Sequence, residues 1–135
     1  EFSAIKRYMD NSINMAREKE YVETILGRRR YLRDINSRNV STRGFAERNA
    51  INAPIQGSAA DIIKIAMVHI QSWLEREKLK TKMLLQVHDE LIFDLHKDEE
   101  KIVKPKVVEL MKTAVIIDVP MEVEVGVGKS WLEAH

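Results

Sequence analysis

Residues 88–90 read His-Asp-Glu, and apolar residues of the kind found in strands flank them in the stretch QVHDELIFD. Two adjacent carboxylates repel each other, which raises a pKa and lowers stability unless a cation lies nearby. A divalent cation removes that repulsion, and carboxylate oxygens are ligands that suit Mg²⁺. The triplet therefore indicates a metal site, although a solvated acidic turn would account for the same residues.

Arginine is concentrated in residues 28–48, which hold seven arginines, no lysine and only two acids, Asp34 and Glu47. Such a segregated basic stretch indicates an anionic partner, nucleic acid first, while a solvated surface with scattered ion pairs is the alternative. The preference for arginine favours phosphate, because a guanidinium binds it through two parallel hydrogen bonds. Together with a magnesium site, it suggests phosphoryl or nucleotidyl transfer.

Composition narrows the classes of protein further. The chain has 135 residues, which fits one domain, and no cysteine, which excludes disulfides, thiolate catalysis and cysteine-ligated zinc. Zinc hydrolysis through histidine is a weaker alternative, because the four histidines lack the HExxH spacing. No apolar run is long enough to span a membrane, so a cytosolic protein is expected. The chain opens without methionine, and we expect a piece of a longer protein.

Apolar spacing in the first half predicts helices around one hairpin. The elements expected are a helix over residues 2–18, a strand over 21–27 that ends in a Gly turn, a return strand in RRRYLRDI, a loop at 36–39, a helix from Ser41 to Ile51, a break at Asn52-Ala-Pro54, and a long helix from 55 to about 77. Ser41 or Thr42 is the expected N-cap of the helix that precedes the break. The break is expected because proline removes a backbone hydrogen bond and clashes with the preceding turn.

The second half predicts a sheet with one more helix. Residues 82–95 resemble a hairpin with the His-Asp-Glu triplet at or near its tip. Residues 98–115 predict a helix with acids in its first turn, and VPMEVEVGVG alternates like a half-exposed strand. The expected fold class is α+β, with an antiparallel sheet, a long kinked helix and flanking helices.

Several long motifs add a family resemblance. The segment QVHDELIFDL resembles motif C of the family A DNA polymerases, of the bacterial DNA polymerase I type. ERNAINAPIQGSAADIIK, residues 47–64, is similar to the segment just upstream of that motif, and YVETILGRRRYLRDI and VEVGVGKSWLEAH also fit the family. The resemblance covers essentially the whole chain in order, and it implies that the sheet is part of the palm in a right-hand polymerase domain.

The resemblance implies roles for individual positions. Asp89 and Glu90 would be catalytic and hold the metals, and His88 would lie near the primer terminus. The other implied DNA contacts are Arg48, Asn52 and Gln56, with secondary phosphate contacts at Arg28, Arg29 and Arg30. Local alternatives exist, since Arg48 could form a surface ion pair and Asn52 and Gln56 could be helix caps. Steps of four at 48, 52 and 56 favour one helix face if Pro54 bends the axis only slightly.

The sequence also departs from the family pattern. It has no stretch resembling DYSQIELR, which carries another catalytic aspartate, and no fingers helix whose Lys and Arg grip the incoming triphosphate. Asp61 is the nearest other acid, but its place in the long helix favours a core or capping role. The chain is thus expected to be the C-terminal part of a polymerase domain, with a fingers remnant over about 1–50 and palm over about 51–135.

The resemblance implies a DNA-directed DNA polymerase that adds deoxynucleotides to a primer 3′ end with two Mg²⁺ ions, in replication and repair. Its partners would be template-primer DNA and a deoxynucleoside triphosphate, in the bacterial cytoplasm at the nucleoid. The isolated chain is expected to be inactive and to self-associate through an uncovered sheet edge. A non-catalytic nucleic-acid-binding module and a metal-dependent nuclease are the alternatives.

Overall fold

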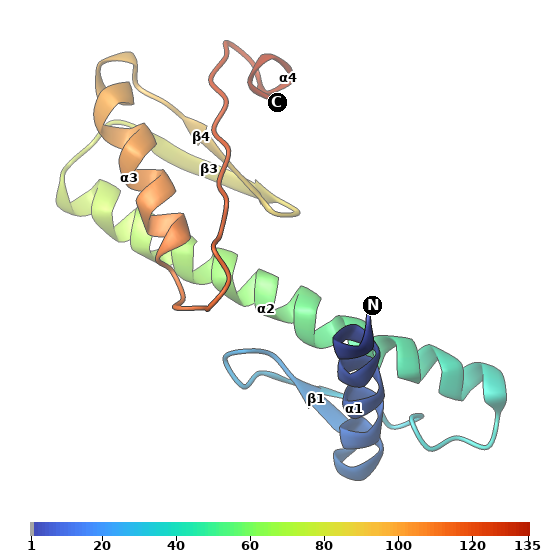
Figure 1. Ribbon diagram of the computed structural model, residues 1–135. Coiled ribbons are helices and arrows are strands. Elements are labelled where there is room, and N and C mark those ends of the chain that lie inside the picture. The colour runs from blue at the N-terminus through green and yellow to red at the C-terminus, as the bar shows by residue number, and fades with distance from the viewer. Residues whose placement is uncertain (1) are drawn as a thin grey trace. The chain divides into compact units, whose positions relative to one another are not determined.

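The computed structural model describes residues 2–135 and has the expected α+β class, with small antiparallel sheets and a long helix (Figure 1). The chain forms two compact units, Glu1–Asp61 and Ile62–His135, and residue 1 of the first unit lies outside the described residues. None of the helices in residues 2–135 is long and apolar enough to cross a membrane.

The first unit contains helix α1 (Ser3–Lys19), strands β1 (Tyr21–Glu23) and β2 (Arg29–Tyr31), and the beginning of helix α2 (Val40–Arg76). The two strands form the predicted antiparallel hairpin, with Val22 opposite Arg30, but β1 ends at Glu23 rather than at residue 27. The turn between them contains Gly27 at φ 79°, in the left-handed region that glycine adopts without strain. The core of the first unit consists of Ala16, Val22, Leu32, Ile35, Ala46, Ala50 and Ala53.

Helix α2 corrects two predictions. It runs unbroken from Val40 to Arg76 with Pro54 inside it, so the break at 52–54 was wrong. A proline costs a helix one hydrogen bond, but Ala50 and Ala53, both in the turn that precedes Pro54, are buried in the core. Packing therefore keeps the helix continuous through the local defect. The predicted N-cap at Ser41 or Thr42 was also wrong, because the side chain of Asn39 accepts hydrogen bonds from the amides of both residues, at 3.0 and 3.1 Å.

The second unit contains the rest of α2, strands β3 (Lys82–Val87) and β4 (Glu90–Asp94), a 3₁₀ turn η1 (Lys97–Glu99), and helices α3 (Glu100–Lys112) and α4 (Trp131–Ala134). Strands β3 and β4 form an antiparallel hairpin with an irregularity between Met83 and Leu85. The buried core is formed by residues of α2 and α3: Ala66, Ile70, Trp73, Leu74, Val103 and Val107.

The alternating segment near residue 120 does not form the predicted strand. Residues 120–128 have no regular secondary structure, and burial alternates only as far as Val123, because Val125 is exposed. A strand requires a neighbour whose N–H and C=O groups complete the ladder, and β3 and β4 in the second unit pair only with each other within residues 2–135. Alternation reports that a segment is able to pair, whereas the presence of a partner is a property of the fold.

The base of the β3–β4 hairpin is fastened by Glu99, which the sequence indicated only as one of the acids in the first turn of a helix. Its carboxylate accepts hydrogen bonds from the Lys80 amide at 2.8 Å, the Thr81 amide at 2.7 Å and the Thr81 hydroxyl at 2.8 Å. Burial raises the pKa of the Glu99 carboxyl, but these hydrogen bonds together outweigh burial, so that its pKa lies below the ordinary value. The folded state therefore favours the charged form.

We expect Glu99→Gln to destabilise the chain at neutral pH, because an amide N–H would face a backbone N–H. A lowered folded-state pKa contributes stability above the ordinary pKa and loses it as the pH falls through the folded value. The difference in the free energy of unfolding between Glu99→Gln and the unchanged chain should therefore shrink as the pH falls below about 4.5, the ordinary pKa of a glutamate. Urea unfolding followed by circular dichroism at pH 7 and pH 4 measures it. Glu109→Gln is the control, since its carboxylate is exposed and, within residues 2–135, pairs only with Lys106 at 3.4 Å. An equal, pH-independent loss in both variants would contradict the expectation.

Candidate functional site

The acidic triplet lies at the tip of the β3–β4 hairpin, as the sequence predicts. His88 and Asp89 form the two-residue turn, and Glu90 opens β4 opposite Val87. His88 has φ 54°, so the first turn residue is in the left-handed region, which two-residue hairpin turns require. Histidine enters that region more readily than most residues other than glycine. A hydrogen bond of 2.8 Å from the Gln86 side chain to the His88 carbonyl supports the turn.

The two carboxylates of this turn differ in their surroundings. Asp89 is exposed, and within the described chain its side chain makes no hydrogen bond or ion pair. Glu90 is half-buried, and its Oε1 lies 3.1 Å from Nδ1 of His135. No cluster of three or more His, Cys, Asp or Glu that could hold a metal occurs among residues 2–135. The turn thus offers hard oxygen ligands that fit a divalent cation, but only part of a ligand set.

The unbroken helix α2 brings Arg48, Asn52 and Gln56 onto one face. All three side chains are exposed, while Ala46, Ala50 and Ala53 of the same helix are buried. The three polar side chains have no hydrogen bond or ion pair within the part of the chain that is described; the Arg48 guanidinium only approaches the ring of Phe45, at 5.9 Å.

The local alternatives for these positions therefore fail. Arg48 has no acid partner in the described chain, and Asn52 and Gln56 lie inside α2 rather than at its start, so neither is a cap. What remains on this face is a row of side-chain donors that point into solvent. Such donors are available to an external acceptor.

The three consecutive arginines of the basic stretch differ in their partners. Arg28 Nε donates to Asp61 Oδ1 at 2.9 Å and its Nη2 to the Gly57 carbonyl at 3.3 Å. Arg29 pairs with Glu23 at 2.9 Å, which raises the pKa of its guanidinium, and lies over the Tyr21 ring at 4.4 Å. Arg30 has no such partner in the described residues. The surface-ion-pair alternative thus holds for Arg29, and Arg30 is available.

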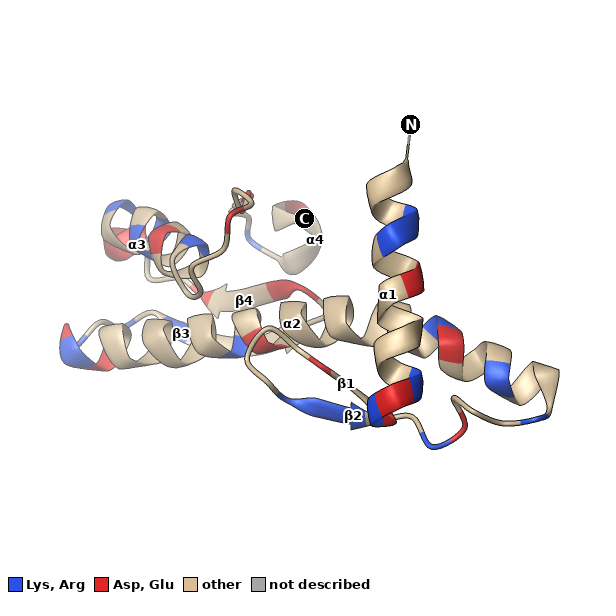
Figure 2. Ribbon diagram, turned by 60° about the horizontal axis from the view of Figure 1, so that its bottom comes forward, with Lys and Arg blue, Asp and Glu red and all other residues tan. Residues whose placement is uncertain are grey.

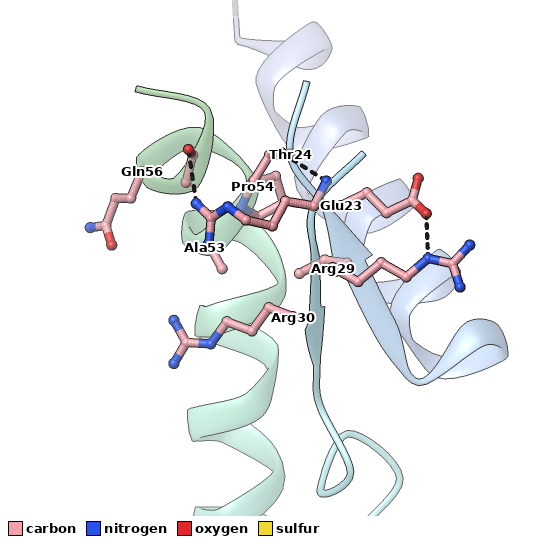
Figure 3. A pocket seen from close by; sticks show the side chains of 10 residues that line it. Glu23, Thr24, Arg29, Arg30, Ala53, Pro54 and Gln56 are labelled. Atoms are coloured by element: carbon pink, nitrogen blue, oxygen red, sulfur yellow. Dashed lines mark hydrogen bonds and ion pairs between the residues drawn. The ribbon is translucent and has the colours of Figure 1, made fainter. Parts of the chain in front are cut away.

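A cavity of about 90 Å³ lies between the β1–β2 hairpin and α2. Figure 3 shows Arg30 and Gln56 extending to the same side of this pocket, whereas Arg29 turns the opposite way to meet Glu23. Residues 28–30, which lead into strand β2 and form most of it, stand out as a continuous basic segment in Figure 2. The first unit therefore offers cationic and amide groups around one small hollow.

Asp61 has a role that the sequence did not reveal. It is buried, with 7% of its surface exposed, and its ion pair with Arg28 joins residues 33 positions apart. A nearby hydrogen bond of 2.8 Å from the Ile25 amide to the Ser58 hydroxyl fastens the same loop to α2. Gly57 allows this close approach, because a Cβ there would lie 2.6 Å from the Thr24 methyl group. No local pattern could have predicted a contact between such distant residues.

Comparison with known proteins extends the resemblance. The sequence model described as DNA polymerase family A matches residues 1–133. DNA polymerase I of Bacillus subtilis (strain 168) is 49% identical over 133 residues, and that of Streptococcus pneumoniae (strain ATCC BAA-255 / R6) is 51% identical over 133 residues. Each match covers 98% of this chain and 15% of the relative, so the chain spans about 15% of the length of these proteins.

A solved structure is similar over the same range. The polymerase domain of Pol1 from M. smegmatis, in complex with DNA primer-template and dNTP, superposes with a TM-score of 0.96 at 46% identity. The match covers 98% of this chain and 24% of that chain.

Proposed function

Since the chain belongs to DNA polymerase family A, we propose that the complete protein containing it is a DNA-directed DNA polymerase that adds deoxynucleotides to a primer 3′ end. The observation that carries this proposal is the exposed Asp89 at the tip of a tight hairpin, next to Glu90. Carboxylates without an internal partner are suited to a metal-dependent step on phosphate. The M. smegmatis relative with bound primer-template and dNTP supports the same reaction class.

We infer that Asp89 and Glu90 contribute oxygen ligands to divalent cations, with Mg²⁺ as the cation that such hard ligands favour. When bound, two such ions would activate the attacking 3′ oxygen and neutralise the triphosphate. The hairpin's contribution is placement, because a two-residue turn leaves Asp89 little backbone freedom. Residues 2–135 hold no cluster of three metal ligands, so a further carboxylate must come from another part of the complete protein.

We propose that the exposed face of α2 contacts the template-primer. Arg48, Asn52 and Gln56 supply donors along this face, and Arg30 adds a cation for phosphate. Arg28 and Arg29 contribute less than the sequence predicts, because each guanidinium already has an acid partner. His88 would face the primer terminus from the acidic turn.

The finer assignments follow from the same proposal. We propose that about 1–50 is a remnant of the fingers with its connection and about 51–135 is palm. As a polymerase of replication and repair, the complete protein would act in the bacterial cytoplasm at the nucleoid.

One experiment tests the proposal and separates its rivals. Primer extension and strand cleavage are measured with Mg²⁺ for the complete protein and for the 135-residue chain. The proposal requires template-dependent extension by the complete protein and none by the 135-residue chain, because residues 2–135 hold no cluster of three metal ligands. Cleavage without extension would indicate a nuclease instead, and DNA binding without either reaction would indicate a binding module.

Gln56→Ala in the complete polymerase should slow extension from a matched primer end more than from a mismatched end. A side-chain amide can donate to purine N3 or pyrimidine O2, which every correct pair presents in the minor groove. A mispair displaces that acceptor, so the hydrogen bond from Gln56 is already absent at a mismatched end and the substitution removes nothing more. The loss for matched ends should be about five- to 150-fold, from 1–3 kcal/mol for an unpaired donor.

The matched control is Gln71→Ala, an exposed glutamine on the same helix whose amide donates to Glu75 at 2.8 Å. It should leave both extension rates unchanged. Single-turnover rates for both primer ends and the melting temperature of each variant decide the matter. Equal losses from both ends together with a lower melting temperature would show that Gln56 serves the stability of α2 instead.

A further inference from the structure

The short helix α4, which follows the extended segment in Figure 1, is stabilised by hydrogen bonds among its own residues and those just before it. The Ser130 hydroxyl accepts a hydrogen bond from the Glu133 amide at 3.4 Å, and the Glu133 carboxylate accepts one from the Lys129 amide at 2.9 Å. The Ala134 amide donates to the Ser130 carbonyl at 3.1 Å. A serine followed three residues later by a glutamate thus supplies two side-chain acceptors for backbone amides at the start of this helical turn.

Two glycines allow α4 to lie directly against the segment that precedes it. A Cβ on Gly126 would overlap the carbonyl of Ala134, and a Cβ on Gly128 would lie 2.6 Å from the Glu133 Cβ. Neither position has a positive φ in the described chain, so the glycines serve close approach rather than an unusual backbone conformation. This contact fixes where the residue after Ala134 emerges.

That residue is His135, and its Nδ1 lies 3.1 Å from Oε1 of Glu90 at the start of β4. The backbone of Glu90 is held by pairing with Val87, so its side chain is the remaining source of freedom. At this distance the imidazole and the carboxylate are in direct polar contact, so the ring limits the positions open to the Glu90 side chain. Two independent features, the glycine contact and the close approach of His135 to Glu90, therefore converge on one carboxylate of the acidic turn.

We propose that His135 is a positioning residue for Glu90: α4, seated on Gly126 and Gly128, holds the imidazole where it restricts the carboxylate beside Asp89. This inference rests on the proposed polymerase function for its effect on the reaction. The contact itself is independent of that function. Restricting a carboxylate before substrate binds lowers the reorganisation needed at the reacting centre.

The first test uses three His135 variants in the complete polymerase. His135→Asn keeps an N–H at the position of Nδ1, whereas His135→Gln moves the donor outward and His135→Ala removes it. We expect kcat for primer extension to fall about two- to fivefold in the Gln and Ala variants, the range that a half-exposed ion pair supports, with an unchanged KM for dNTP. The Asn variant should remain near the unchanged enzyme. The control is His69→Ala, which removes an exposed imidazole from α2.

A double substitution tests whether His135 acts through Glu90. In a Glu90→Ala background, His135→Ala should cause no additional loss of kcat. Losses that multiply would overturn the proposal, because they would show that His135 acts on another group, such as DNA. Equal activity of the Asn and Ala variants would overturn it as well.

A measurement without metal, substrate or turnover tests the contact itself. Millisecond hydrogen–deuterium exchange on the complete protein in EDTA should show the amides of Glu133 and Ala134 exchanging about two- to fivefold faster in both His135→Ala and Glu90→Ala. Asp89→Ala should not change them. Unchanged exchange in both variants would overturn the inference. If the unchanged enzyme fails to extend primers, the proposed function fails while the exchange data still decide on the contact.

Discussion

Asp89→Ala in the complete polymerase should reduce the rate of primer extension by on the order of a thousandfold and leave DNA affinity nearly unchanged. Metal ions supply several kcal/mol of charge stabilisation in the transition state, and about 1.36 kcal/mol corresponds to a tenfold change in rate. An interaction made mainly in the transition state affects the rate rather than ground-state binding. Asp89 suits this role because it is exposed and has no internal partner among residues 2–135.

Single-turnover extension rates and DNA dissociation constants for the Asp89 variant test this expectation. Asp94→Ala is the matched control, because Asp94 is an exposed aspartate at the opposite end of the same β4 strand. It should retain nearly full activity. Glu90→Ala should lose less than Asp89→Ala. Equal losses in these two variants would show that the ranking is wrong, and a parallel loss of DNA affinity would assign Asp89 to binding.

Local patterns predicted the elements whose causes are local. The apolar spacing in residues 2–18 corresponds to helix α1, and the paired apolar runs around His88 and Asp89 correspond to the β3–β4 hairpin. Local patterns failed where contacts between distant parts of the chain determine whether a helix continues or a strand forms. Pro54 should end a helix, but burial of its neighbours in the core keeps α2 continuous. The alternation near Val123 indicates a strand, but no described neighbour completes a ladder.

The site shows the same division. The acidic turn was visible because its members are adjacent, and the face of Arg48, Asn52 and Gln56 because they follow the helical period. The ion pair of Asp61 with Arg28 and the contact of His135 with Glu90 join residues that are far apart in sequence, so no spacing indicated them. The serine–glutamate pair of α4 was a readable capping signal, and it would have predicted that turn.

Arg28→Met should destabilise the first unit by about 1.5–3 kcal/mol, the range for a hydrogen bond to a charged partner. Removing Arg28 should cost more than removing the charge of Asp61, because the Arg28 side chain is 57% exposed whereas that of Asp61 is 8% exposed. Losing the arginine leaves a buried carboxylate without this cation. Asp61→Asn removes the buried charge and still offers Arg28 an amide oxygen, so it should cost about 1 kcal/mol or less.

Denaturant unfolding of the 135-residue chain, followed by circular dichroism, gives the free energies of unfolding. Circular dichroism is required because Trp73 and Trp131 both belong to the second unit. Arg29→Met is the control on the neighbouring residue, since its ion pair with Glu23 is exposed on both sides and should matter by less than about 1 kcal/mol. Adding Asp61→Asn to Arg28→Met should recover part of the loss, because the second change removes the buried charge that the arginine no longer neutralises. If Asp61→Asn costs as much as Arg28→Met, the stabilisation comes from the geometry of the bond rather than from the buried charge, and the asymmetry argued from exposure is wrong.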